Sequence, residues 1–213
     1  MSPYGVSFDI DQQPKYDKTQ VVIRIVLLIV LSIIGGAIGW VFGLAYLIVP
    51  VAAAIMISQN GAATYFAESD TKMKKWLRWG IGAYAYLGML TDKMPSGDSS
   101  DSAVRFEVTP TGEPTASNVL VRIILAIPHA VVLGVLGIIA GLLVLIAAIM
   151  VLINESYPEG IFSFLRGYAR WNARLYAYLA GFVQEYPPFA LDTGSETASP
   201  PPAPQPADVT PGA

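Results

Sequence analysis

The sequence predicts an all-α membrane protein with a minor β component, built as a tandem repeat of two units. Three observations carry this prediction. The chain matches itself when it is shifted, it contains two long apolar runs, and it is 54% hydrophobic but only 14% charged, whereas soluble domains carry about 25% charged residues. Each unit is expected to hold a short strand, a transmembrane helical hairpin and an amphipathic interfacial helix, giving four membrane helices.

The repeat appears at an offset of 98 residues, which becomes 92 after Ile57. Matched positions include residues 6–10 with 104–108, Arg24 with Arg122, Gly36, Gly39 and Gly43 with Gly134, Gly137 and Gly141, Arg78-Trp79 with Arg170-Trp171, Tyr86 with Tyr178, and Pro95 with Pro187. Repeats set the architecture of a chain. We therefore divide this one into a first unit (1–95), a linker (96–103), a second unit (104–191) and a Pro/Ala-rich tail (192–213) that is expected to be disordered.

The two strands are expected at residues 6–10 and 104–108, where apolar and polar residues alternate. Phe8 and Phe106 lie on the apolar side of this pattern. The strands are expected to pair with each other or with extended segments nearby.

The apolar runs extend from Val21 to Ile57 and from Val119 to Ile153, each with a single arginine. As one straight helix the first run would be about 55 Å long, which is too long for a hydrocarbon core about 30 Å thick. Each run is therefore expected to fold back as a hairpin, with bends at Gly35–Trp40 and at Gly134–Gly137. Shallow, partly inserted hairpins remain an alternative.

All 13 lysines and arginines lie outside the proposed bends. Hairpins return the chain to its starting side, so these cations share one face, and the positive-inside rule makes that face cytoplasmic. We expect a multi-pass protein of the cell membrane with both termini in the cytoplasm.

A third helix follows each run, at about residues 72–90 and 159–183. Both are rich in aromatic residues, and the second carries Arg166, Arg170 and Arg174 at every fourth position, which places them on one face. Basic and aromatic side chains together are typical of helices that lie in the membrane interface. The stripe, with Trp79 and Trp171, is expected to contact anionic lipid or a partner; a solvated face is the alternative.

Arginine also occupies equivalent places, Arg24 and Arg122, near the start of each run. We expect these side chains to snorkel to the headgroups; a clamp on a lipid phosphate is the alternative. Pro128-His129 is a candidate polar site within the membrane. A kinked helix with a hydrogen-bonded histidine is favoured there over a proton relay, because neither run contains an acidic residue.

Other chemistry is limited by composition. Cysteine is absent and His129 is the one histidine, so we expect no metal site, no cofactor and no enzymatic activity. A net charge of −3 offers no basic field for nucleic acid. Glycines spaced by four residues favour close helix packing, with homo-oligomerisation as a further possibility.

The second unit carries a characteristic series of short motifs: Leu125-Ala126-Ile127-Pro128-His129, Tyr157-Pro158, Arg170-Trp171-Asn172, Tyr176-Ala177-Tyr178 and Tyr186-Pro187-Pro188-Phe189. This series resembles a bacterial membrane family known only as the domain of unknown function numbered 4389. The first unit is a diverged example that lacks the Pro-His pair. The resemblance implies a membrane protein with a small hairpin unit and brings no activity.

The leading functional expectation is a non-enzymatic membrane scaffold or accessory subunit. It would contact membrane lipids and a membrane protein partner or a second copy of itself. A small transporter or channel component is the alternative.

Overall fold

Six helices and two strands make up the part of the chain that the structure describes. The computed structural model describes residues 4–35, 38–69, 72–98, 100 and 102–192, without the side chains of 31–42 and 68–69. In chain order the elements are β1 (Val6–Ile10), α1 (Lys18–Gly35), α2 (Ile38–Ser69), α3 (Met73–Leu87), β2 (Val104–Val108), α4 (Ala116–Leu125), α5 (Ile127–Asn154) and α6 (Glu159–Leu179).

The two strands pair with each other, which confirms the expected sheet and both strand boundaries. They are antiparallel, and Phe8 lies directly opposite Phe106. Both phenylalanines are fully buried, so the apolar side of the alternation faces the protein. The sheet thus pairs the two segments that match at an offset of 98 residues in the sequence.

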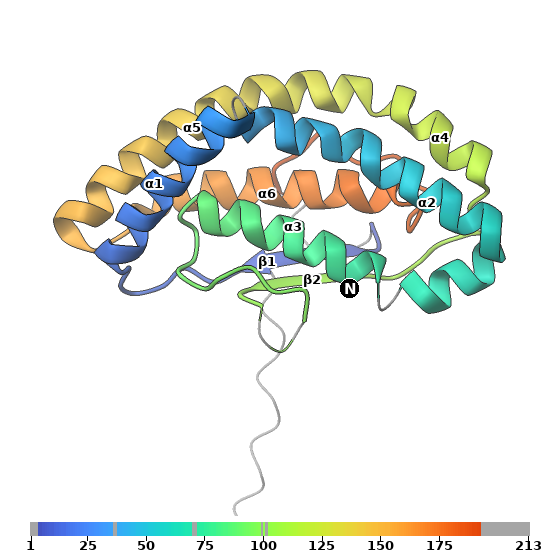
Figure 1. Ribbon diagram of the computed structural model, residues 1–213, viewed down its shortest axis with the longest axis horizontal. Coiled ribbons are helices and arrows are strands. Elements are labelled where there is room, and N and C mark those ends of the chain that lie inside the picture. The colour runs from blue at the N-terminus through green and yellow to red at the C-terminus, as the bar shows by residue number, and fades with distance from the viewer. Residues whose placement is uncertain (1–3, 36–37, 70–71, 99, 101, 193–213) are drawn as a thin grey trace, which may run out of the picture.

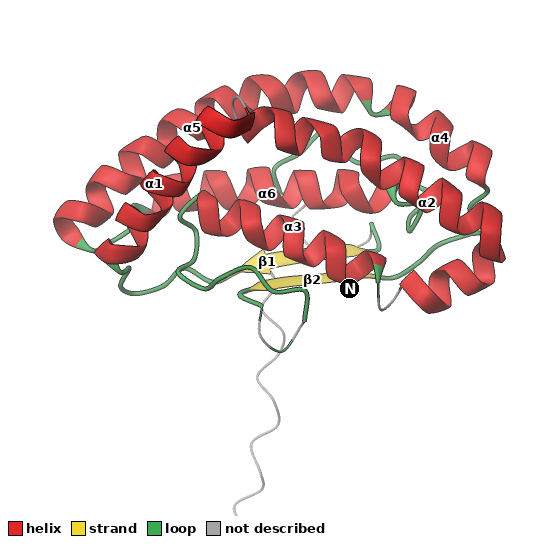
Figure 2. Ribbon diagram, in the orientation of Figure 1, coloured by secondary structure: helices red, strands yellow, loops and turns green. Residues whose placement is uncertain are grey.

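Four apolar helices form an arch along one side of the molecule (Figure 1). α1 and α2 follow each other from one end of the arch to the other, while α4 and α5 run in the opposite direction beside them. In this arrangement α1 packs against α5, and α2 packs against α4. Helices α3 and α6 lie beneath the arch, and the two strands lie beneath these helices (Figure 2). The protein is therefore layered, with the apolar helices outermost.

The predicted hairpin bend at Gly134–Gly137 is wrong, because α5 runs without interruption from Ile127 to Asn154. A glycine inside a helix costs only about 1 kcal/mol relative to alanine, which does not break a helix of this length. The helical run is interrupted instead at Ala126, between the end of α4 and the start of α5. Pro128 follows in the first turn of α5.

In the first run, α1 ends at Gly35 and α2 begins at Ile38. The expected bend at residues 35–40 falls partly on residues 36–37, which lie outside the described residues. The two arms do not lie side by side as a hairpin; they follow each other along the arch (Figure 1). Each arm also packs on a helix of the other unit, so tertiary packing decides the angle between the arms.

Among the described residues, two stretches are long and apolar enough to cross a membrane, Gly43–Ala67 in α2 and all of α5. In each stretch, only 22% of the most apolar 18-residue window is buried within the protein. The core helix of a soluble domain would be mostly buried. The expected four membrane helices are not reproduced, since α4 has ten residues and would be about 15 Å long. The Pro/Ala-rich tail lies outside the described residues from position 193 onward.

The third helices begin as expected but end earlier, at Leu87 and Leu179. Both end in the same way: the N–H of Gly88 bonds to the carbonyl of Tyr84, and the N–H of Ala180 bonds to that of Tyr176. The next residue, Met89 or Gly181, has a positive φ of 60° or 80°. A left-handed residue after the last turn is a common way to stop a helix.

Candidate functional site

The layer beneath the arch holds buried arginines, which is the main departure from the expected lipid-facing pattern. Predicted contact residues that are 0–2% exposed are Arg24, Arg122, Arg170 and Arg174. A buried guanidinium is stable only when its donors are paired. Burial therefore corrects the expectation that these side chains reach headgroups or solvent, and it places them in the interior of the protein.

Arg24 and Arg122 lie in equivalent surroundings in the two units. The Arg24 guanidinium lies over the ring of Tyr86 at 4.3 Å, and that of Arg122 over the ring of Tyr178 at 4.6 Å. Arg24 also forms a 2.6 Å ion pair with Asp92. The contacts of Arg24 with Tyr86 and of Arg122 with Tyr178 are cation–π interactions. The two tyrosines are matched by the offset of 92 residues.

The polar partners of Arg122 differ from those of Arg24. Its Nη1 donates to the carbonyl oxygens of Tyr178 and Val183 at 2.6 and 2.7 Å, and its Nε donates to Asn118 at 3.0 Å. The second unit thus holds its arginine with neutral acceptors, whereas the first uses a carboxylate.

Two further arginines bind the strand of the opposite unit. Arg78 of α3 donates through Nη2 to the carbonyl of Phe106 at 3.1 Å, and Arg170 of α6 donates through Nε to that of Phe8 at 3.0 Å. Each also pairs with the acidic residue that follows the phenylalanine, Arg78 with Glu107 at 3.4 Å and Arg170 with Asp9 at 3.1 Å. These reciprocal bonds attach the sheet to the helices.

The predicted arginine stripe of α6 is directed at β1 and the C-terminal segment. Asp9 lies 3.7 Å from Arg166 and 3.1 Å from Arg170, and Arg174 donates to the carbonyl of Ala190. The Arg166 side chain keeps 28% of its surface exposed, so it is the member of the stripe that can reach a partner. A helical spacing of four identified a common face but not what that face contacts.

A second reciprocal pair links α2 and the turn after α5 to the ends of the third helices. The Tyr65 hydroxyl donates to the carbonyl of Ala180 at 2.5 Å, and the Tyr157 hydroxyl donates to that of Gly88 at 3.1 Å. Both tyrosines and both acceptors are matched by the offset of 92 residues.

His129 lies in a closed aromatic cluster with Trp171, Tyr186 and Phe189. The indole Nε1 of Trp171 donates to His129 Nδ1 at 3.0 Å, and the imidazole stacks on Phe189 with centroids 4.0 Å apart and planes 11° apart. His129 is 0% exposed and Trp171 only 4%, which corrects the expectation that Trp171 faces lipid. The geometry agrees with the favoured interpretation of a hydrogen-bonded histidine after a helix break.

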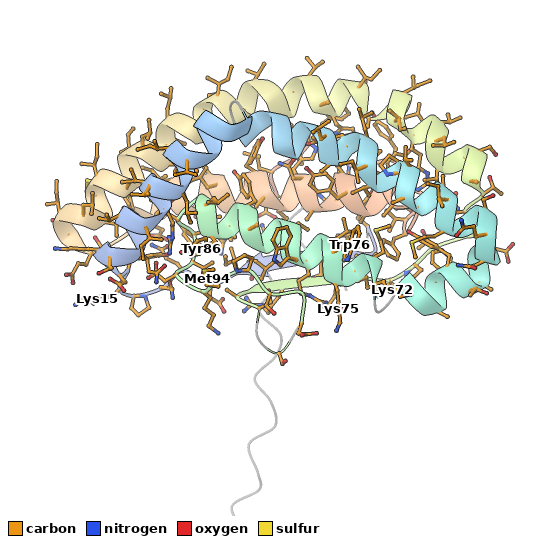
Figure 3. The ribbon with its side chains drawn as sticks, in the orientation of Figure 1. Lys15, Lys72, Lys75, Trp76, Tyr86 and Met94 are labelled. Atoms are coloured by element: carbon orange, nitrogen blue, oxygen red, sulfur yellow. The ribbon has the colours of Figure 1, made fainter. Side chains whose placement is uncertain are left out.

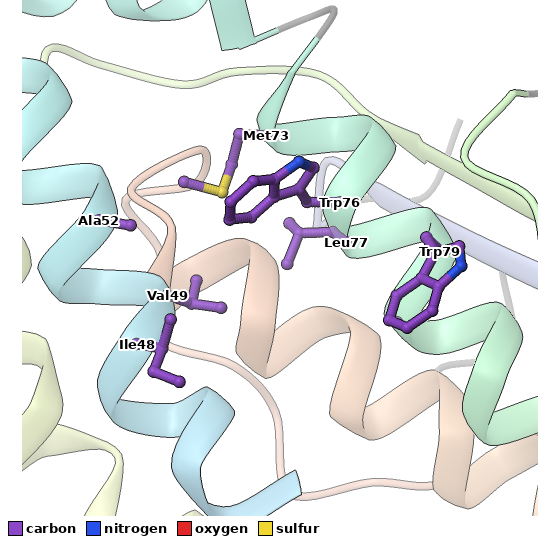
Figure 4. A pocket seen from close by; sticks show the side chains of 8 residues that line it. Ile48, Val49, Ala52, Met73, Trp76, Leu77 and Trp79 are labelled. Atoms are coloured by element: carbon purple, nitrogen blue, oxygen red, sulfur yellow. The ribbon is translucent and has the colours of Figure 1, made fainter. Parts of the chain in front are cut away.

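Trp79, the first-unit counterpart of Trp171, is 54% exposed. It lines an apolar groove of about 420 Å³ between α2 and α3 (Figure 4). The walls are Ile48, Val49 and Ala52 from α2, and Met73, Trp76 and Leu77 from α3. Sequence analysis missed this groove, because the residues of its two walls lie far apart in the chain.

Exposed charged residues at one end of the arch and on the sheet form local pairs. Glu155, which follows α5, accepts ion pairs from Lys15 at 2.7 Å and Lys18 at 3.4 Å, and these neighbours lower its pKa. The Asp11 carboxylate receives hydrogen bonds from Arg105, which lower the pKa of Asp11. Burial raises the pKa of Tyr16 to about 12.

No group of three or more histidine, cysteine, aspartate or glutamate side chains that could hold a metal ion occurs among the described residues.

Residues 116–190 match the model of a family described as a domain of unknown function, DUF4389. The match spans α4, α5, α6 and the segment that carries Phe189, and it supports the resemblance found in the second unit. No curated protein and no solved structure matches this chain.

Proposed function

We propose that this chain is a membrane protein whose arch is immersed in the bilayer from one side, and that it acts as a non-enzymatic scaffold or accessory subunit. The observation that carries the proposal is the outer surface of the arch. Exposed large apolar side chains cover all four helices; on α5 alone they include Val131, Val135, Ile138, Leu142, Leu145, Ile149 and Ile153, each 57–70% exposed. Figure 3 shows side chains projecting outward along the arch.

An apolar surface of this extent is unusual for a soluble monomer. Contiguous exposed patches beyond a few hundred Å² mark membrane or protein contacts. The charged residues of the arch helices support membrane contact, because they lie at the ends of the arch or beneath it. Lys18 is at the start of α1, Glu155 follows the end of α5, and Arg24 and Arg122 are buried on the inner side.

The arrangement favours shallow insertion, the alternative that the sequence left open. At both of its ends the arch curves back toward the layer that contains α3, α6 and the sheet (Figure 1). In this proposal that layer faces the cytoplasm, since exposed lysines such as Lys72 and Lys75 belong to it. Both ends of the described chain then lie on the same side.

We also propose that the two units arose by duplication and are related by an approximate twofold axis. Three sets of equivalent contacts support this: the Arg24–Tyr86 and Arg122–Tyr178 cation–π pairs, the Arg78–Phe106 and Arg170–Phe8 bonds, and the Tyr65–Ala180 and Tyr157–Gly88 bonds. The last two sets each cross from one unit to the other.

A structural role is favoured over transport because the polar groups beneath the arch serve internal contacts. Arg122 binds backbone carbonyls, His129 accepts from Trp171, and Tyr46 donates to Asn172 at 2.7 Å. The scaffold would contact lipids, a membrane protein partner or a second copy through the apolar arch, Trp79 and Arg166. Ion flux in liposomes that is lost in His129→Ala would contradict this role.

Cysteine labelling tests the insertion, because the chain has no cysteine of its own. In Val135→Cys, whose parent side chain is 58% exposed on the arch, we expect no reaction with an impermeant maleimide from either side of the membrane until detergent is added. Lys72→Cys should react from the cytoplasmic side. Reaction of Val135→Cys in intact cells or inverted vesicles would exclude an immersed arch.

A further inference from the structure

The groove between α2 and α3 is an apolar recess that the chain leaves open. Trp76 and Trp79 on its rim are 70% and 54% exposed, as is Ile48 on the α2 side at 55%, whereas Met73 and Leu77 are buried. Figure 4 shows the α2 and α3 side chains facing each other across it. Exposed tryptophans beside a preformed recess are typical of a binding surface.

In the second unit, the tryptophan that matches Trp79 is covered by the chain itself. Trp171, which matches Trp79, is covered by Phe189 and hydrogen-bonded to His129. The offsets put Gly97 at the position of Phe189 and Leu31 at that of His129. The first unit therefore has no histidine and no phenylalanine at the positions that cover the tryptophan in the second, and Trp79 stays 54% exposed.

The chemistry around the groove indicates which ligand it suits. Its lining is almost entirely carbon, which suits a hydrocarbon chain. At the start of α3, beside Met73 and Trp76, lie the exposed residues Lys72 and Lys75, of which Lys75 pairs with Asp98 at 2.6 Å and remains 51% exposed. Ammonium groups next to tryptophan at a membrane surface complement an anionic lipid headgroup.

We propose that this groove binds one acyl chain of an anionic phospholipid, with the headgroup phosphate held by Lys72 and Lys75. The volume of about 420 Å³ lies within the range of roughly 300–1,000 Å³ that is usual for small-molecule sites. This inference rests on the proposed membrane location, which supplies the lipid. It goes further in naming one lipid class and one site.

Quenching of tryptophan fluorescence by brominated lipid tests the proposal on the full chain in detergent micelles. Phosphatidylglycerol with brominated acyl chains is titrated into the protein, and saturable quenching is expected. The saturable component should disappear in the W76F/W79F variant. Phosphatidylcholine with the same chains should bind roughly tenfold more weakly, because it lacks the net charge that the lysines attract.

Blocking variants separate the groove from general contact with lipid. Ala52→Phe fills the groove from α2, and Gly80→Leu fills it from α3, where an added Cβ meets no atom within 4 Å. Both should abolish saturable quenching. Ile55→Phe is the matched control, because Ile55 is on α2, is 51% exposed and is not part of the lining; it should behave as wild type. Thermal unfolding of each variant identifies any that is misfolded.

The outcomes distinguish this inference from the proposed function. Quenching that does not saturate, or that is equal in Ala52→Phe, Gly80→Leu and wild type, overturns the groove assignment. Equal affinity for both headgroups overturns the anionic lipid, and loss of quenching with a doubled particle mass assigns the groove to a second copy. A protein that stays soluble without detergent contradicts the membrane location, whatever the groove binds.

Discussion

At the scale of single residues, the arginines explain how this protein holds polar groups beneath apolar helices. A guanidinium has five donors in a planar fork and stays charged. Arg122 donates to a carbonyl oxygen in the last turn of α6 and to another beyond its end, and Arg170 uses its fork to join a strand carbonyl with Asp9. The same residues that the sequence presents as lipid ligands thus act as internal connectors.

Arg170→Met should destabilise the fold by about 1–3 kcal/mol, because the Phe8 carbonyl and Asp9 lose a buried donor. Arg170→Lys should restore little, since an ammonium does not reproduce the fork. Thermal unfolding in detergent, followed by circular dichroism, measures both. Lys93→Met is the control variant, because Lys93 is exposed and takes no part in these contacts. A loss of stability in Lys93→Met equal to that in Arg170→Met would contradict the internal role of Arg170.

His129→Leu should cost about 1–3 kcal/mol of stability, because the buried Trp171 N–H loses its acceptor. In the H129L/W171F double variant that N–H is absent, so the combined loss should be smaller than the sum of the single losses. A double-mutant cycle on unfolding free energies measures the difference. Additive losses would show that the hydrogen bond does not couple these residues.

At the scale of elements, α5 illustrates why an apolar run with glycines need not bend. The glycines at 134, 137 and 141 sit in an unbroken helix of 28 residues. Gly134 and Gly141 have open space around the position of a Cβ, whereas a Cβ on Gly137 would meet the Tyr168 hydroxyl at 3.0 Å. A side chain at position 137 would thus press on Tyr168 of α6, whereas Gly134 lies in open space inside an unbroken helix.

Gly134→Ala should therefore stabilise the protein by about 0.5–1 kcal/mol, the usual gain for alanine over glycine inside a helix. Gly137→Ala should destabilise it, because Tyr168 must move and its bond to the Leu133 carbonyl at 3.2 Å is disturbed. The two midpoints of thermal unfolding provide the comparison. Destabilisation by Gly134→Ala would instead support a bend at that position.

At the scale of the whole molecule, the described ion pairs lie at the ends of the arch or beneath it, and they make the stability of the protein depend on pH. The pKa values of Asp11 and Glu155 are lowered in the folded state by Arg105 and by Lys15 with Lys18. Groups with a lowered folded pKa stabilise the protein above their unfolded pKa, near 4. That stabilisation is lost as the pH falls through the folded pKa.

Acidification from pH 7 to pH 3 should accordingly lower the unfolding midpoint, and Asp11→Asn should make this dependence shallower. The effect of the single pair at neutral pH should be below about 1 kcal/mol, since Asp11 and Arg105 are largely exposed. Midpoints measured across this pH range test it. Glu113→Gln, outside the described ion pairs, is expected to keep the wild-type dependence.

The sequence alone determined the local features of this protein. It placed both strands to the residue, and it matched positions whose contacts are equivalent, such as Arg24 and Arg122 with their tyrosines. The strands follow from the alternation of neighbouring residues, and the matched positions follow from self-similarity along the chain. It did not indicate the exposed groove, whose walls come from two helices that are brought together only by folding.

Only the tertiary structure decided which way the arms and the arginines point. Periodicity assigned Arg170 and Arg174 to one face, but that face packs on β1 and the C-terminal segment rather than on lipid. The two apolar runs become an arch, not two hairpins, because each arm packs against the other unit. A sequence pattern indicates which residues form a surface. The element that covers this surface is determined by contacts between residues that are distant in the sequence.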